Sequence, residues 1–308
     1  MIGTGKAALV GCAALLLAGC GSDAGADGGP PDARTADAAI ADASMPDAAS
    51  PDASEAACAM DCAGVVAPTL MVPGDGLVLW LRADVGVRAA LPSHRVCGWC
   101  DLSAAGNHLA ARNPAQQTLW VAASSGGHPA VSWADTEALE RSDTLGIAPT
   151  AGRTLAIVVR LDDAAVRSSP FYQALDGSVF LSWGLDPNTF QTVGKRFGVY
   201  MHNNAFDAAS STDLKPHVHV LTVDSMVPGG VVGKVLHYHV DGALQALTAA
   251  PGSSAANLVL DFSPANTTKL GYGGPARMTI SEVLVYDRPL PDVDRQAVEQ
   301  ALRTRYGL

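Results

Sequence analysis

Hydrophobic residues between about residues 74 and 308 fall in short runs that are separated by Gly, Pro, Asn and Asp. The runs are rich in Val, Tyr, Phe and Thr, and several alternate apolar with polar positions, which is typical of β-strands. This pattern favours an all-β sandwich or barrel over alternating βαβ units. The expected strands are GLVLWLRAD (76–84), RTLAIVVRL (153–161), SVFLSWGL (178–185), RFGVYMHN (196–203), HVHVLTVDS (217–225), KVLHYHVDG (234–242), NLVLDFSP (257–264) and TISEVLVYD (279–287).

The end of the chain predicts a helix packed on the last strand. Residues 291–308 begin with acidic residues, carry Arg near the end and finish at Gly307, as helices do. The strand before it is apolar on both faces, with Val283 and Val285 on one and Ile280, Leu284 and Tyr286 on the other. A strand of this kind is covered on both sides. We therefore expect Val298, Ala301 and Leu302, which share one helix face, to cover the second side.

Four stretches resemble the concanavalin A-like lectin/glucanase superfamily, and within it the bacterial laminin G-like branch. They are GLVLWLRAD (76–84), VCGWCDLSAAGNHLAA (96–111), LHYHVDGAL (236–244) and ISEVLVYDRPLPDVDRQAVEQALRTRYGL (280–308). In the second stretch, the residues that match the family's turn are Trp99, Asp101, Ser103, Gly106 and Asn107. The resemblance implies a jelly-roll β-sandwich of two curved antiparallel sheets with a short C-terminal helix. Two departures are the cysteines at 97 and 100 and Pro291, which stands where a Ser or Thr cap is usual.

The first twenty residues predict an export signal that ends in a lipidated cysteine. The apolar run from Ala7 to Gly19 is too short for a membrane-spanning helix, which needs roughly 20 residues, but it suits a signal-peptide core. LAGC (17–20) resembles the bacterial lipobox, in which the cysteine is acylated and becomes the new N-terminus. Acyl chains on Cys20 would hold the chain on a lipid bilayer, and Gly21, in place of Asp, favours the outer membrane or cell surface. The alternative is an ordinary secretory signal with an incidental cysteine.

Residues 21–57 predict a disordered spacer. Pro-Asp-Ala recurs in it, large apolar residues are nearly absent, and seven Asp and one Glu against one Arg give a charge of −7. No core can offset the chain entropy, and like charges keep the segment extended. Residues 58–74 form a cysteine-bearing lead-in, and residues 75–308 form the folded domain. Residues 58–308 hold no basic stripe, so we expect no nucleic-acid partner.

The acidic residues of the domain argue against a glycan-cleaving enzyme. Glycosidases use two carboxylates that flank one bond, and a Glu-x-Asp-x-x-Glu strand motif is absent. Only four Glu follow Gly74, namely Glu137, Glu140, Glu282 and Glu299. We therefore expect a non-catalytic recognition module that binds a glycan or an extracellular protein. A hydrolase or lyase that uses Asp residues, and a purely structural envelope protein, are the alternatives.

Two His-x-His pairs stand out on neighbouring predicted strands. His217 and His219 share one strand face, as do His237 and His239. One register would gather the four imidazoles into a Zn or Cu site, and a one-residue slip would separate them. We favour the reading without a metal, with these histidines on a solvated sheet face. The sequence names no cofactor, and it leaves open calcium, which many relatives bind through loop Asp and carbonyl oxygens.

One sheet surface is a candidate for ligand binding. If strands 178–185, 196–203 and 234–242 share a sheet, its outer side mixes aromatic rings with hydrogen-bonding groups, as sugar-binding surfaces do. The residues on that side are Phe180, Arg196, Tyr200, His202, His237 and His239. An ordinary polar sheet surface is the alternative, because monomers expose scattered aromatic residues. On the binding interpretation, Tyr200→Ala and His237→Ala weaken binding.

Four cysteines remain once Cys12 is removed with the signal and Cys20 is lipidated: Cys58, Cys62, Cys97 and Cys100. An exported chain meets oxidising conditions, so disulfides are expected, although the same spacings also fit zinc. Pairing within each doublet would close only tiny loops. We therefore predict two bridges that join the first doublet to the second, with the order unassigned, which would fasten the end of the spacer to the domain.

Overall fold

The computed structural model describes residues 60–112, 117–134, 137–163, 168–175, 178–185, 196–201, 204–211, 213–224, 235–250, 253, 267–271 and 277–308. All of these residues belong to one compact unit, Asp52–Leu308. Cys20, the spacer 21–57, Cys58 and the expected strand 257–264 lie outside the described residues. No helix in the described part of the chain is long and apolar enough to cross a membrane.

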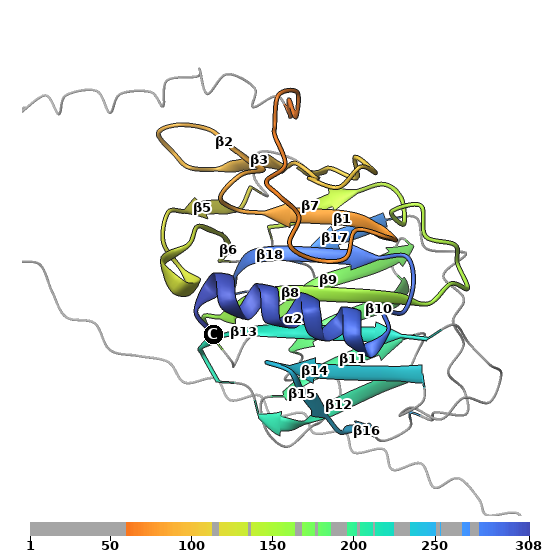
Figure 1. The fold of residues 1–308 in the computed structure, drawn as a ribbon. Helices are drawn as coiled ribbons and strands as arrows, with labels where there is room; N and C mark the ends of the chain where they lie inside the picture. The colour runs from red at the N-terminus through yellow and green to blue at the C-terminus, as the bar shows by residue number, and fades with distance from the viewer. Residues whose placement is uncertain are drawn as a thin grey trace, which may run out of the picture. The chain divides into compact units, whose positions relative to one another are not determined.

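Two antiparallel sheets build this unit (Figure 1). The 8-stranded sheet contains, in spatial order, β15 (Ala243–Gln245), β14 (Leu236–Val240), β13 (Pro216–Val223), β8 (Arg153–Leu161), β18 (Met278–Tyr286), β6 (Ala130–Trp133) and β5 (Leu119–Val121), with β1 (Leu77–Arg82) also paired to β18. The 10-stranded sheet contains β16 (Leu247–Ala249), β12 (Asn204–Ser211), β11 (Arg196–Met201), β10 (Ser178–Leu185), β9 (Ser168–Leu175), β17 (Thr267–Leu270), β7 (Leu139–Arg141), β4 (Leu109–Ala111), β3 (Val96–Trp99) and β2 (Val87–Ala89). A short 3-10 helix, η2, spans Ser125–Gly127, and the helix α2 spans Asp292–Tyr306. The predicted all-β sandwich with a C-terminal helix is confirmed.

The main core lies between the two sheets. Alternate residues of the 8-stranded sheet point inward, among them Leu155 and Ile157 of β8 and Leu221 of β13, and each is almost fully buried. Phe171 and Phe206 belong to the same cluster and come from the 10-stranded sheet. Because side chains alternate between the faces of a strand, the residues between these positions face the other side.

A second core lies on the outer face of the 8-stranded sheet, under α2. Figure 1 shows α2 across this face, over β8 and β13. Val298 and Leu302 of the helix are fully buried against Leu284 and Tyr286 of β18. The predicted packing of the helix on the second side of the last strand is therefore confirmed for these residues, whereas Ala301 is only half-buried.

The predicted face of Ile280 is wrong. The sequence places Ile280 on the same side of β18 as Leu284 and Tyr286, but Ile280 packs in the core between the sheets. The pairing of β18 with β8 shifts register between Ile280 and Glu282. Such a shift interrupts the alternation of side chains between the two faces of a strand. An even-numbered residue before the shift therefore faces the opposite side from the even-numbered residues after it.

The turn after β3 is organised by one aspartate. Asp101 Oδ1 accepts hydrogen bonds from the backbone N–H groups of Trp80 and Ser103, at 2.7 and 2.9 Å. Its Oδ2 accepts bonds from the Ser103 hydroxyl and from the Asn107 N–H, each at 2.7 Å. Asp101, Ser103 and Asn107 are three of the residues that carry the family resemblance, and in this structure they hold the turn against β1.

The lead-in is fastened to this turn by a disulfide between Cys62 and Cys100. The bridge joins one cysteine of the first doublet to one of the second, which is the kind of pairing that the sequence led us to expect. Cys97 is disulfide-bonded as well. Cys58, the partner that remains for it if both bridges join the two doublets, lies outside the described residues.

Candidate functional site

The strands of the predicted ligand-binding surface do not share a sheet. Strand β10, which contains Phe180, and β11, which contains Arg196 and Tyr200, belong to the 10-stranded sheet, whereas β14, with its two histidines, belongs to the 8-stranded sheet. Sequence periodicity gives each strand its two faces but does not decide its partners. The single surface is therefore a wrong prediction, and His202 lies outside the described residues.

The sheet register also separates the two histidine pairs. On β13 and β14, His219 lies opposite Val240 and His239 lies opposite Val220. Directly opposed residues point to the same side, so His219 faces the core between the sheets while His239 faces the side covered by α2. The four imidazoles do not cluster, and the described residues contain no group of three or more His, Cys, Asp or Glu side chains arranged to hold a metal ion.

His217 and His219 are both held by hydrogen bonds to neighbouring side chains of the fold. The His217 ring lies between two carboxylates, with Nδ1 2.6 Å from Asp241 Oδ2 and Nε2 2.8 Å from Asp213 Oδ1. The hydrogen bond with Asp241 is the largest cause that raises the pKa of His217 to about 9. His219 is buried, its Nδ1 lies 2.5 Å from the Tyr238 hydroxyl, and burial lowers its pKa to about 3.

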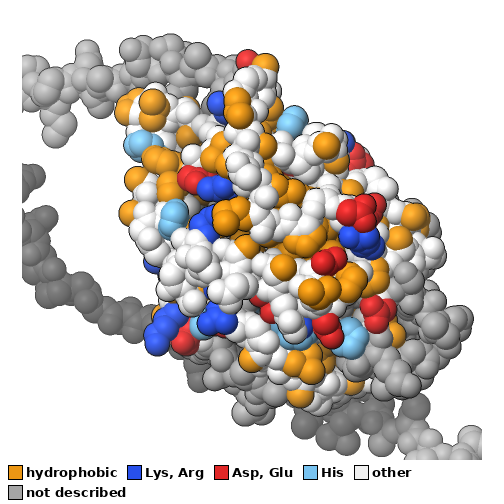
Figure 2. Space-filling model, in the orientation of Figure 1, with side chains coloured by type: hydrophobic (Ala, Val, Ile, Leu, Met, Phe, Trp, Pro, Cys, Tyr) orange, Lys and Arg blue, Asp and Glu red, His pale blue; other side chains and the backbone are white. Residues whose placement is uncertain are grey.

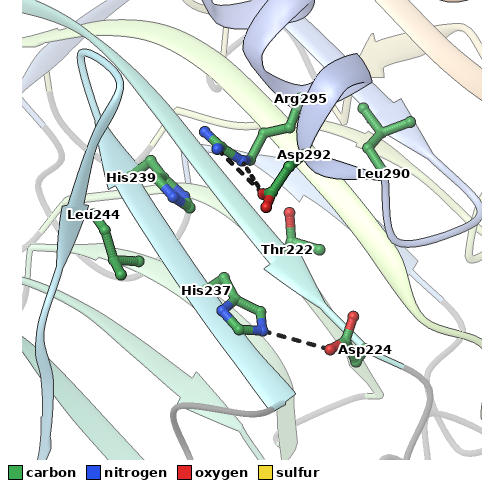
Figure 3. A pocket seen from close by; sticks show the side chains of 8 residues that line it. All are labelled: Thr222, Asp224, His237, His239, Leu244, Leu290, Asp292 and Arg295. Atoms are coloured by element: carbon green, nitrogen blue, oxygen red, sulfur yellow. Dashed lines mark hydrogen bonds and ion pairs between the residues drawn. The ribbon is translucent and has the colours of Figure 1, made fainter.

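The other two histidines, His237 and His239, line a pocket of about 370 Å³ on the outer face of the 8-stranded sheet. The pocket lies where α2 begins, beside β13, β14 and β15, and its lining residues are Thr222, Asp224, His237, His239, Leu244, Leu290, Asp292 and Arg295. Figure 3 shows the two histidines side by side on one strand, below the helix turn that carries Asp292 and Arg295. Figure 2 shows histidine and acidic side chains gathered on this face near α2.

Local structure explains how distant residues meet at this pocket. Asp241 and Gly242 both have positive φ angles, of 50° and 85°, which close the tight hairpin between β14 and β15. The hairpin brings the exposed Leu244 to one side of the pocket. On the other side α2 begins after Pro291, and its first turn supplies Asp292. Pro suits the start of a helix because it needs no N–H partner there.

Charges in the pocket are largely paired. The Arg295 side chain is 7% exposed, and its Nη1 donates to Glu299 Oε1 at 2.6 Å. Its Nε and Nη2 both approach Asp292 Oδ1 at 3.3 Å. At the other end of the pocket, His237 Nε2 lies 3.5 Å from Asp224 Oδ2. The arginine is thus held between two carboxylates, and each lining carboxylate lies beside one cationic or titratable partner.

His239 is the unusual group in the lining. The residue is only 7% exposed, and its Nδ1 is buried with no hydrogen-bond partner among the described residues. Burial, together with the nearby Arg295 guanidinium, lowers the pKa of His239 to about 4. The ring is therefore a neutral imidazole at pH 7, with one donor and one acceptor nitrogen. Buried polar atoms are rarely left without a partner, so this atom points to a ligand or a water.

Two glutamates of the domain, Glu282 and Glu140, are engaged away from the pocket. Glu282 is 1% exposed and accepts hydrogen bonds from Trp80 Nε1 at 2.7 Å, from Arg305 at 2.6 Å and from the Tyr306 hydroxyl at 3.0 Å. Glu140 pairs with Lys269 at 2.9 Å. Glu282 thus ties α2 to β18 and β1, which is a structural role.

Sequence reasoning named only two of the eight pocket residues, His237 and His239. It missed Asp224, Asp292 and Arg295, which stand at a strand end and in a helix turn that are far apart in the chain. The signals were a carboxylate directly after the strand HVHVLTV and a Pro-Asp pair that opens the last helix. Neither signal says that the two segments meet.

No protein-family model and no curated protein matches the chain. Among solved structures, a mutant of the GH54 α-L-arabinofuranosidase soaked with 4-nitrophenyl α-L-arabinofuranoside is similar with a TM-score of 0.53 and 14% identity, over 77% of this chain and 61% of that one. The Trypanosoma rangeli sialidase in complex with sialic acid has a TM-score of 0.45 and 19% identity, over 78% of this chain and 36% of that one. This chain therefore spans about a third of the sialidase. At such identities, the likeness to the arabinofuranosidase extends to the fold alone.

Proposed function

We propose that this protein is a lipid-tethered recognition module of the cell envelope, which binds a glycan or an extracellular protein without cleaving it. The observation that carries the proposal is the pocket at the start of α2. It combines two leucines with hydroxyl, imidazole and carboxylate groups in about 370 Å³. Binding pockets typically have such a size and such a mixture of apolar lining with a few placed polar groups.

The tether follows from the N-terminal sequence. An acylated Cys20 would hold the chain on a bilayer, and the acidic residues 21–57 would keep the folded unit away from the surface. A pocket on an exported domain of this kind meets ligands outside the cytoplasm, such as glycans and the surfaces of other proteins.

The absence of cleavage is supported by the carboxylates. Glu282, Glu140 and Glu299 are each held by a cation inside the described fold, so none of them is poised to act on a ligand. Arg295 likewise holds Asp292.

A polysaccharide hydrolase or lyase is the second candidate, for one specific reason. Asp224 and Asp292 line the same pocket. Two carboxylates that flank the scissile bond are the catalytic groups of most glycosidases. The solved structure of similar fold named above is itself an arabinofuranosidase.

One experiment separates the two candidates. The full-length protein is incubated with a panel of polysaccharides, with calcium and with a chelator, and both retention and newly formed reducing ends are measured. We expect retention without product. His237→Ala should weaken binding by roughly tenfold, the loss of one or two ligand hydrogen bonds. Tyr200→Ala, on the other sheet, serves as the matched control and should leave binding unchanged.

If product forms and its formation is lost in Asp224→Asn, the protein is an enzyme and the proposal of a non-catalytic recognition module is wrong. Membrane fractionation of Cys20→Ser tests the tether separately, because the variant should leave the membrane fraction. Full membrane retention of this variant would refute the lipid anchor.

A further inference from the structure

We propose that the pocket at the start of α2 takes an uncharged, hydroxyl-bearing sugar residue and excludes acidic sugars such as uronic and sialic acids. The inference rests on the proposed function, since it names the ligand class of that same pocket. It goes further because it assigns a preference for neutral over acidic sugars, and this preference is argued from the charges of the lining residues.

The one arginine in the described lining of the pocket is already paired with carboxylates. Arg295 is the only arginine or lysine in the described lining, and each of its three side-chain nitrogens already donates one hydrogen bond to Glu299 or Asp292. A ligand carboxylate would have to share the guanidinium with these two carboxylates or displace one of them. Displacing Glu299 would leave a buried charge, since its side chain is only 5% exposed, and uncompensated buried charges are strongly unfavourable.

The helix start does not supply the missing positive charge. The N-terminus of a helix of this length attracts anions through its free N–H groups and its dipole. In α2 the first turn already carries Asp292 and Asp294. Asp292 lines the pocket, so the end of the helix that faces the ligand presents a carboxylate.

The carboxylates at the two ends of the pocket repel an acidic sugar. Asp224 lies beside His237 at one end, and Asp292 lies beside Arg295 at the other. Like charges brought together in a binding site lower affinity. The repulsion is stronger at Asp224, whose side chain is 40% exposed, than at Asp292, whose side chain is 87% exposed and screened by solvent. The same carboxylate oxygens favour the binding of a neutral sugar. A carboxylate accepts hydrogen bonds from hydroxyl groups, and these bonds are stronger than those to neutral acceptors.

Uncharged groups complete the match to a sugar. Thr222 contributes a hydroxyl, and His239 contributes a neutral imidazole whose buried Nδ1 has no partner among the described residues. Both groups can donate to or accept from a sugar hydroxyl. Leu244 and Leu290 supply apolar surface for the C–H side of the ring. An ammonium ligand fits less well, because each carboxylate already has a neighbour that is cationic or becomes so on protonation.

The test compares neutral and acidic probes that are otherwise matched. Lactose is compared with sialyllactose, and galactan with polygalacturonate, by equilibrium binding to the full-length protein at pH 7. We expect each neutral probe to bind at least roughly tenfold more tightly than its acidic counterpart. Asp224→Asn and Asp292→Asn should reduce this difference in affinity between neutral and acidic probes. Asp294→Asn removes the same charge from the same helix turn outside the pocket lining, and it should leave this difference unchanged.

Two failures are distinguishable. Acidic probes that bind as tightly as neutral ones would overturn the selectivity and leave the recognition function intact. Binding of no sugar at all, with the protein folded, would remove the glycan function and this inference together. If an Asn variant does not fold, the salt dependence of the unmodified protein decides. High salt screens repulsion, so acidic probes should bind better in it, and an unchanged or weaker affinity would contradict the proposal.

Discussion

His217 and His219 lie two residues apart on one face of β13, yet their surroundings give them opposite protonation states at neutral pH. His217 sits between Asp213 and Asp241, which stabilise the imidazolium. His219 is buried among Tyr238 and the ring of Phe197, 4.4 Å away between centroids, so the neutral form is favoured. Nearby carboxylates and burial shift histidine in opposite directions, and the burial of each position decides which effect dominates.

His217→Gln should lower stability in a pH-dependent way. The folded-state pKa of His217, about 9, lies above the 6.5 of a free histidine. The ion pairs therefore stabilise the fold fully below pH 6.5, and this contribution is lost as the pH rises through 9. We expect the variant to be less stable by about 1–2 kcal/mol near pH 6, the scale of a hydrogen bond to a charged group.

Chemical denaturation of both proteins at about pH 6 and about pH 10 measures this difference. His219 and the two carboxylates face the same ring, and because the pKa of each is lowered, none of them changes protonation state between pH 6 and pH 10. A stability difference of the same size at both pH values would show that the charge of His217 contributes nothing.

At the level of elements, β18 is the strand around which the sandwich is built. It pairs with β1, β6 and β8, and its two faces belong to two different cores. The helix α2 covers one face, and the Glu282 carboxylate binds Arg305 and Tyr306 of that helix. A buried charge of this kind requires its partners, so helix and strand depend on one another.

Leu302→Ala should destabilise the domain by about 2–5 kcal/mol, because it leaves a cavity in a core where the side chain is fully buried. Gln300→Ala is the matched control on the exposed face of α2 and should stay within about 0.5 kcal/mol of the unmodified protein. Urea unfolding of the three proteins measures both values. Equal stabilities for the leucine variant and the unmodified protein would contradict the packing of α2 on β18.

The sequence predicted which segments form strands and the helix better than it predicted which strands pair with one another. The period of two residues identifies a strand, and the apolar faces of β18 together with the spacing of Val298 and Leu302 predicted the helix contact. The register shift after Ile280 left no local signal, because a bulge depends on the partner strand. For the same reason nothing in the sequence assigned β11 and β14 to different sheets, and the pocket residues Asp224 and Asp292 could not be brought together.

At the level of the whole molecule, the predicted attachment and the candidate pocket belong to separate parts of the chain. The predicted anchor and spacer occupy residues 1–57, and the pocket lies within the sandwich. Between them, the lead-in joins the domain through Cys62 and Cys100.

The cysteine pairing can be tested directly on the exported, full-length chain. Non-reducing peptide mapping should find the peptide with Cys62 linked to the peptide with Cys100, and the peptide with Cys58 linked to the one with Cys97. The Cys62–Cys100 bridge spans 38 residues, so restriction of the unfolded chain should contribute about 2–4 kcal/mol. The double variant Cys62→Ser/Cys100→Ser should lose stability on that scale while the domain still folds. Links within each doublet, or four free thiols with bound zinc, would mean that the lead-in is not fastened to the sandwich in this way.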